Sequence, residues 1–320
     1  MLAVGLALAA SLCWGSGDFL GGLTTRRATL WAVVVGSQAI GLAGAVLVVL
    51  VTGRPWIGMS GLWPVLLGGV AGSVALMAFY KALAIGTMSV VAPITATSAL
   101  IPFLWGIGSG ERPSELQLAG VALAVAGVLL VTVERPRRGK RVGVGVVPGE
   151  PAIEPPDPGP RGSEDGSMGS TTGGTPVSVP DRAVQRRAVL LALVAAVGIG
   201  LMLLGYDETA KHDALWALLG GRISSACFFT VFLLALRPRI GMRRSALPGI
   251  VAVGILDTSA NGLFALATTQ GFLSLVAVLG SLYPVVTVVL AYLVLRERLA
   301  RHQVIGVVGA LVGVALIAAR

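Results

Sequence analysis

The sequence predicts an all-α integral membrane protein with ten transmembrane helices, arranged as two inverted five-helix repeats. Hydrophobic residues make up 55% of its 320 residues and charged residues only 12%, about half the share of a soluble globular chain. Several uncharged apolar runs exceed the roughly 18 residues that read as a membrane-spanning helix. One pattern of glycine and turn residues also occurs twice, offset by about 185 residues, which indicates an internal duplication.

The duplicated pattern is specific because its members agree on one offset. Residues 86–92 read G-T-M-S-V-V-A, and residues 271–277 read G-F-L-S-L-V-A. An apolar run follows each block, and then a Glu-Arg pair, a glutamine and two glycines. These are Glu111-Arg112, Gln117, Gly120 and Gly127 in the first half, and Glu297-Arg298, Gln303, Gly306 and Gly313 in the second. Any single match is weak in a chain with 44 glycines, so the shared offset carries the inference.

Ten spans account for the apolar runs. They are expected at 2–21, 29–52, 63–85, 87–109, 116–133, 187–206, 214–236, 247–267, 271–295 and 303–319. The runs are continuous and do not alternate at ten-residue spacing, which favours helices over a transmembrane barrel. Each half holds an odd number of spans, so the second half begins on the opposite membrane face. Inverted repeats of this kind are a recurring construction of secondary transporters, with the site near mid-membrane.

A polar segment separates the two halves. We expect a first repeat at 1–134, a linker at 135–186 and a second repeat at 187–320. The linker is rich in Pro, Gly, Ser and charge, a composition typical of disorder. Lys and Arg gather mainly on the linker's face of the membrane, and the positive-inside rule then places the linker in the cytoplasm and the termini outside.

Several function classes are not predicted. The net charge of +9 reflects basic loops on one membrane face, and the basic patches with interleaved aromatics of nucleic-acid binders are missing. Cys13 and Cys227 both lie in apolar runs, without the spacing of a disulfide framework or metal site. We therefore expect no metal, no cofactor and no nucleic-acid partner. No catalytic motif suggests an enzyme.

The pattern resembles the EamA family of the drug/metabolite transporter superfamily. The resemblance rests on Trp14-Gly15, on the two G-x-x-S-x-V-A blocks and on the Glu-Arg turns followed by Gln-x-x-Gly. It covers both repeats and implies a central cavity, alternating access, and cargo among amino acids, other metabolites or drugs. The chain departs from the family pattern where Ala99 stands opposite Pro284. Family members are generally drawn with cytoplasmic termini, against the charge distribution, so orientation stays open.

Charged residues inside the spans are candidate functional residues, because burying charge in a bilayer is costly. Arg222 and Asp257 are expected at similar membrane depth, with Asn261 one helical turn beyond Asp257 on the same face. One interpretation is a substrate site in which Arg222 or Asp257 holds an oppositely charged substrate group and Asp257 takes a proton as coupling ion. The other is an ion pair that only satisfies itself between two helices.

A second candidate pair lies near the linker's face. Asp18 and Lys81 could form a gate there, although Lys81 could instead snorkel to the interface. Trp14, Tyr80 and Tyr283 could line the cavity and stack on substrate, or anchor the helices at the interface.

Prolines and turn carboxylates complete the candidate positions. Pro93, Pro102 and Pro284 are expected to kink the fourth and ninth spans, or to be tolerated by packing. Glu111 and Glu297 are expected to tie helix ends in the turns.

The sequence thus predicts a secondary active transporter in the plasma membrane. It would move a small metabolite, amino acid or drug-like molecule by alternating access, by efflux or uptake. A non-transporting scaffold or sensor on the same fold is the alternative, and a membrane-bound enzyme is a third. The lipid bilayer and a small-molecule substrate are the expected partners. Gly309 and Gly313 form a small-xxx-small face that would serve packing within the half or a homodimer contact.

Overall fold

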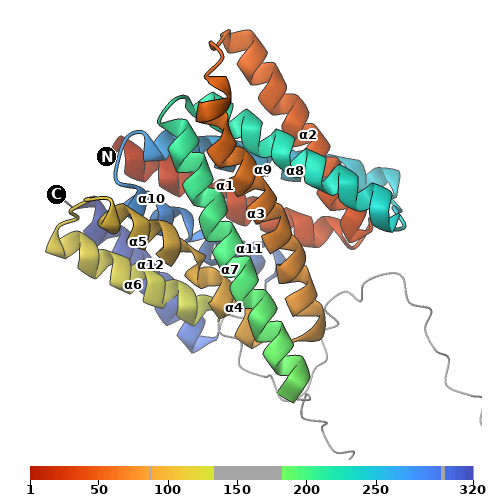
Figure 1. Ribbon diagram of the computed structural model, residues 1–320. Coiled ribbons are helices and arrows are strands. Elements are labelled where there is room, and N and C mark those ends of the chain that lie inside the picture. Colours follow the sequence, from red (N-terminus) through yellow and green to blue (C-terminus); the bar gives the residue numbers. More distant parts are fainter. Residues whose placement is uncertain (87, 133–181, 297–299, 320) are drawn as a thin grey trace, which may run out of the picture.

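The computed structural model describes residues 1–86, 88–132, 182–296 and 300–319 (Figure 1). In this part of the chain, 10 helical segments are long and apolar enough to cross a membrane. The first repeat consists of α1 (Leu2–Thr24), α2 (Leu30–Thr52), α3 (Gly58–Ile85), α4 (Met88–Ala96), η1 (Thr97–Ala99), α5 (Leu100–Gly108) and α6 (Glu115–Thr132). The second consists of α7 (Arg182–Ala210), α8 (Ala214–Leu236), η2 (Arg244–Ala246), α9 (Leu247–Thr268), α10 (Leu273–Gly280), α11 (Tyr283–Leu295) and α12 (Arg301–Ala318). The chain is thus an all-α membrane protein built as two inverted repeats.

Two predicted boundaries need correction. Helix α3 begins at Gly58, ahead of the expected start at 63, and α7 begins at Arg182, ahead of 187. Residues 182–186, which we assigned to the linker, are therefore helical. Residues 183–187 are exposed, so Arg186 and Arg187 stay solvated while the helix continues past the apolar run. The remaining residues of the predicted linker, 135–181, lie outside the described residues.

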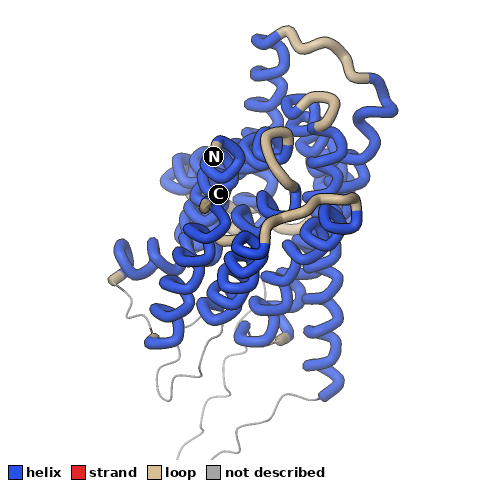
Figure 2. Tube along the Cα trace, turned by 90° about the vertical axis from the view of Figure 1, so that its left-hand side faces the viewer, coloured by secondary structure: helices blue, strands red, loops and turns tan. Residues whose placement is uncertain are grey.

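The ten spans define two membrane faces. We call the face at Met1 and Ala319 the terminal face, and the face where α6 ends and α7 begins the linker face. Both termini lie on the same side of the bundle (Figure 2), as an even number of spans requires. Helices α1, α3, α8 and α10–α11 run from the terminal face to the linker face, and α2, α4–α5, α7 and α9 run back.

The two repeats interlock. The most extensive helix contacts join α3 to α7, α6 to α12 and α1 to α9, and each of these pairs takes one helix from each repeat. Helix α2 packs against α8 and α9, and α5 packs against α10. Figure 1 shows α3 beside α7 and α6 beside α12. The main hydrophobic core accordingly contains residues from both halves, among them Val65, Val121, Phe264 and Val276.

Glycine faces bring α6 and α12 into close contact. A Cβ on Gly127 would lie 2.6 Å from the Gly306 carbonyl oxygen, and one on Gly313 would lie 2.7 Å from the Gly120 carbonyl oxygen. Small residues permit such close approach of membrane helices. The Gly309–Gly313 face therefore packs against the other repeat, which is neither of the two arrangements we expected. A homodimer would have to use a different surface.

The fourth and ninth spans are both broken near their middle. Helices α4 and α5 are separated by the 3-10 segment Thr97–Ala99, and α10 and α11 by Ser281 and Leu282. These breaks fall at corresponding positions of the two repeats. Pro284 stands in the first turn of α11, where the amide hydrogen it lacks would have no partner in the helix. At the second break the Ser281 and Leu282 amides still donate to the Ala277 and Leu279 carbonyls, so the helix changes locally while each span as a whole remains long enough to cross a membrane.

Candidate functional site

The predicted charged pair is formed. The Arg222 Nη1 atom on α8 lies 2.6 Å from Asp257 Oδ2 on α9, as a hydrogen-bonded ion pair. Arg222 begins its helix's third turn from the terminal face, while Asp257 lies ten residues into α9 from the linker face. The two depths coincide because the helices run in opposite directions. Arg222 is only 3% exposed, whereas the Asp257 side chain is 35% exposed, so the carboxylate is the accessible member.

Two polar residues that the sequence did not single out support Arg222. The Gln38 Oε1 atom on α2 accepts a hydrogen bond from Arg222 Nη1 at 3.1 Å, and another from Ser225 Oγ at 3.0 Å. An amide inside an apolar span is itself unusual, and that was the available signal. The identity of its partner, 184 residues away in the sequence, depends on how the two repeats pack.

Asn261 lies beside Asp257 as expected. Its Nδ2 atom donates to the Asp257 backbone carbonyl at 2.7 Å and to Asp257 Oδ1 at 3.4 Å. The Arg222 Nε and Nη2 atoms and the neighbouring Thr258 Oγ1 atom are buried without a hydrogen-bond partner among the described residues. Because unpaired buried polar groups are costly, this cluster retains capacity for water or a ligand group.

Asp18 and Lys81 do not meet in this structure. The ion pairs between described residues do not include either side chain. The predicted contact is therefore not formed in this structure, and the gate stays a prediction. Asp18, on α1, instead lies near enough to Asp257 for the two carboxylates to interact. Both Asp18 and Lys81 are exposed.

The three predicted aromatic residues lie around these charges, and each is half-buried. The Trp14 ring centroid lies 6.5 Å from that of Tyr283 and 5.8 Å from that of Phe264. Phe264 was not predicted. Tyr80 on α3 and Tyr283 at the start of α11 are both close enough to Asp18 for an electrostatic interaction. The aromatic rings thus come from both repeats.

Gly15 allows α1 to touch the broken ninth span. A Cβ on Gly15 would lie 2.6 Å from the Tyr283 carbonyl oxygen and 2.5 Å from Val286 Cβ. The Thr287 hydroxyl on α11 also donates to the Gly15 carbonyl at 3.1 Å. Only a residue without a side chain fits here, so the Trp14-Gly15 pair places α1 directly against the start of α11.

Glu111 connects the two repeats at the terminal face. Its carboxylate accepts hydrogen bonds from the backbone amides of Leu273 at 2.7 Å and Ser274 at 3.0 Å. Glu111 therefore caps α10, a helix of the other repeat. The expectation that it ties helix ends is confirmed, with the end belonging to the opposite half. Its repeat counterpart Glu297 lies outside the described residues.

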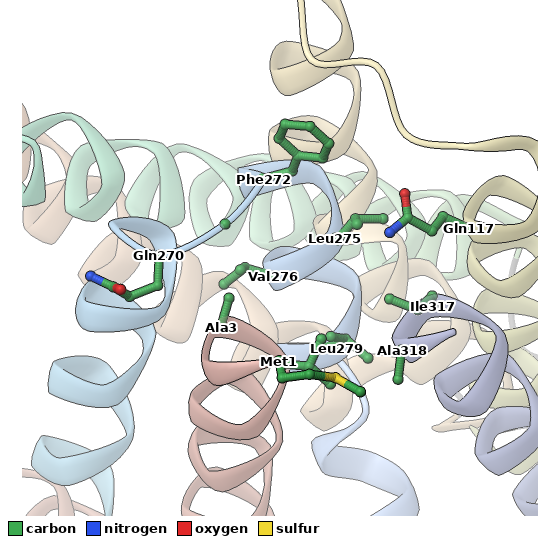
Figure 3. Close-up of a pocket in the computed structure, with 12 residues that line it drawn as sticks. Met1, Ala3, Gln117, Gln270, Phe272, Leu275, Val276, Leu279, Ile317 and Ala318 are labelled. Atoms are coloured by element: carbon green, nitrogen blue, oxygen red, sulfur yellow. The ribbon is translucent and has the colours of Figure 1, made fainter. Parts of the chain in front are cut away.

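Figure 3 shows a pocket away from the charged cluster. It has a volume of about 200 Å³ and lies at the terminal face between α1, α10 and α12, lined by Met1, Ala3, Gln117, Phe272, Leu275 and Ile317 among others. A second pocket of about 510 Å³ is lined partly by Leu104 and Trp105, which are exposed on the outer surface. Neither pocket contains the charged cluster.

Comparisons with known proteins agree with this architecture. A family model described as the EamA-like transporter family matches residues 1–133 and 186–319. The comparison with curated proteins found no match. One solved crystal structure, described only as that of a protein, has a TM-score of 0.72 and 17% sequence identity to this chain, and the match covers 99% of this chain and 96% of that one. At that identity the likeness supports the fold alone. Because the family match spans both repeats, the chain belongs to the EamA-like transporter family, within the drug/metabolite transporter superfamily.

Proposed function

We propose that the chain is a secondary active transporter that moves a small metabolite, amino acid or drug-like molecule across the plasma membrane by alternating access. The observation that carries this proposal is the hydrogen-bonded cluster of Gln38, Arg222, Asp257 and Asn261 at membrane depth. Charge at this depth is costly, and it marks transport pathways in membrane proteins. The two broken spans lie at matching positions in the repeats, and such spans commonly form transporter sites.

Within this proposal, Arg222, Asp257, Asn261, Trp14, Tyr80 and Tyr283 contact the substrate. Asp257 is the accessible carboxylate of the ion pair. During transport it would release Arg222 and bind a substrate group or a coupling proton instead. Asp18 and Lys81 form a gate near the linker face when that face closes. The two five-helix repeats move relative to each other, and the segment between the end of α6 at Thr132 and the start of α7 at Arg182 connects them.

A non-transporting scaffold or sensor is the competing function. A scaffold requires its buried charges to satisfy each other, whereas Arg222 keeps two nitrogens without a described partner. That observation favours a site that accepts further groups. A membrane-bound enzyme is disfavoured in addition because the family consists of transporters.

Two linked experiments test the proposed function. First, a library of metabolites is screened for thermal stabilisation of the purified full-length protein, because a ligand that binds the folded state raises its stability. Each stabilising compound is then measured as a radiolabelled tracer in counterflow across proteoliposomes, with protein-free liposomes as control. A transporter gives saturable counterflow of at least one stabilising compound. Stabilisation without counterflow by any compound would favour the scaffold or sensor. Imposed pH gradients then test whether protons drive the flux.

A further inference from the structure

The contact between Glu111 and α10 joins the repeats at the terminal face. Glu111 follows α5 in the first repeat, and the amides of Leu273 and Ser274 begin α10 in the second. A carboxylate at a helix N-terminus is favoured by the helix dipole and by the unpaired amides of the first turn. Hydrogen bonds to an ionised group are also stronger than neutral ones. This is therefore a strong and directional contact between two halves of the molecule.

The local sequence holds Glu111 in this position. Gly110 has φ of +98°, a conformation that favours glycine, and it turns the chain so that the Glu111 amide donates to the Gly106 carbonyl at 3.0 Å. Gly106 leaves room for the carboxylate, because a Cβ there would collide with Glu111 Oε2 and lie 3.1 Å from the Ser274 amide nitrogen. Two glycines are thus used to place one carboxylate.

Helix α10 links this contact to the neighbourhood of the charged cluster, because it packs against α9, which carries Asp257. It is the terminal-face half of the broken ninth span, and it packs against α1, α5 and α9. The other half, α11, begins at Tyr283, which approaches Trp14 and Gly15. Fixing the first turn of α10 therefore holds this half of the ninth span against helices of both repeats.

We propose that the Glu111–α10 contact is a latch that holds the terminal face closed, and that its release lets this face open. This rests on the proposed alternating-access function. In the conformation seen here the latch is formed, while Asp18 and Lys81, near the linker face, are apart. One contact between the repeats is thus formed at the terminal face, whereas the two residues proposed to close the linker face form no ion pair.

Two further observations support a second conformation in which this region opens. The Ser11 hydroxyl on α1 and the Ser274 hydroxyl on α10 are 2% and 0% exposed as residues and have no described hydrogen-bond partner. Opening the terminal face would hydrate both, which removes the cost of burying them unpaired. The pocket in Figure 3 lies beside the first turn of α10, so this turn has adjacent space into which it can move.

The test measures whether water reaches Ser11. In the full-length protein, the two native cysteines are removed by Cys13→Ala and Cys227→Ser. Ser11→Cys then serves as the reporter. The rate of its reaction with a charged methanethiosulfonate reagent is followed by mass spectrometry, well below the unfolding temperature. Glu111→Gln and Glu111→Ala are compared with Glu115→Gln, which removes an exposed carboxylate of the same turn region. Ala217→Cys, at a fully buried position of α8, is the control reporter.

Both Glu111 variants are expected to raise the Ser11→Cys reaction rate at least about tenfold, a factor equivalent to about 1.4 kcal/mol. Glu115→Gln is expected to leave the rate within about twofold, and Ala217→Cys is expected to stay unreactive. Unchanged reactivity in the Glu111 variants would make the contact a structural cap only. An equal rise at Ala217→Cys would show general unfolding and also reject the latch. The assay needs no cargo, so the latch and the proposed function can fail separately. If the Glu111 variants raise the Ser11→Cys reaction rate while every flux assay fails, the proposed function is rejected and the latch is kept.

Discussion

The Arg222 Nη1 atom lies 2.6 Å from Asp257 Oδ2 across the α8–α9 interface, and the two residues differ strongly in exposure. The guanidinium is buried, supported by Gln38, whereas the carboxylate is partly accessible. In such a pair the buried cation is held in place, while the partly exposed anion remains able to contact a further group. The predictions that follow separate this role in transport from a role in stability.

Asp257→Asn is expected to abolish transport while the protein still folds. The amide keeps the shape of the side chain and an acceptor for Arg222, but it can neither carry the charge nor take up a proton. Initial counterflow rates and thermal unfolding are measured for this variant and for Glu208→Gln, which removes a carboxylate near the terminal face. Undiminished transport by Asp257→Asn would contradict the proposed role.

A double-mutant cycle separates the ion pair from its site. Asp257→Leu alone leaves the Arg222 charge buried without its anion and is expected to destabilise the protein by about 3–5 kcal/mol. Combining it with Arg222→Met removes the charge and is expected to recover most of that loss, without recovering transport. Reversible unfolding in detergent supplies the free energies. A double variant that transports at the parental rate would show that the pair serves structure only.

Charge reversal tests the Asp18–Lys81 gate. The two residues are separated here, so the gate is expected to form only when the linker face closes. Asp18→Lys and Lys81→Asp are each expected to reduce counterflow, and the double reversal to restore at least part of it. If the double variant is no more active than the weaker single one, the two residues act independently.

Gly15→Ala is expected to destabilise the protein by about 1–3 kcal/mol, because the added Cβ overlaps the Tyr283 carbonyl and the Val286 side chain. Gly5→Ala provides a matched control in the same helix, since no atom lies within 4 Å of the position its Cβ would take. The two variants are compared by thermal unfolding. Equal unfolding temperatures would mean that close contact between α1 and α11 at Gly15 does not contribute to the stability of the protein.

Much of the fold was predictable because a bilayer restricts the alternatives. Without water to pair with backbone amides and carbonyls, apolar runs of this length form helices. The offset shared by Gly86 and Gly271 identified the repeats and the family. Arg222, Asp257 and Asn261 were found because charge and amide groups at membrane depth need partners. The early start of α7 was missed because exposed charged residues prolong a helix without prolonging its apolar run.

By itself, the sequence determined the number of spans, their inverted arrangement and the residues whose polarity is costly at membrane depth. Only the tertiary structure decided which of these residues meet. Gln38 reaches Arg222 across 184 positions, and Glu111 reaches Leu273 across 162, because each repeat packs against the other more than against itself. Local pattern specifies a helix and its polar positions. The pairing of helices from different repeats depends on the shapes of their packed faces. Gly15 and Gly106 show this, because each lies where a side chain would collide with a helix of the other repeat or with the group that contacts it.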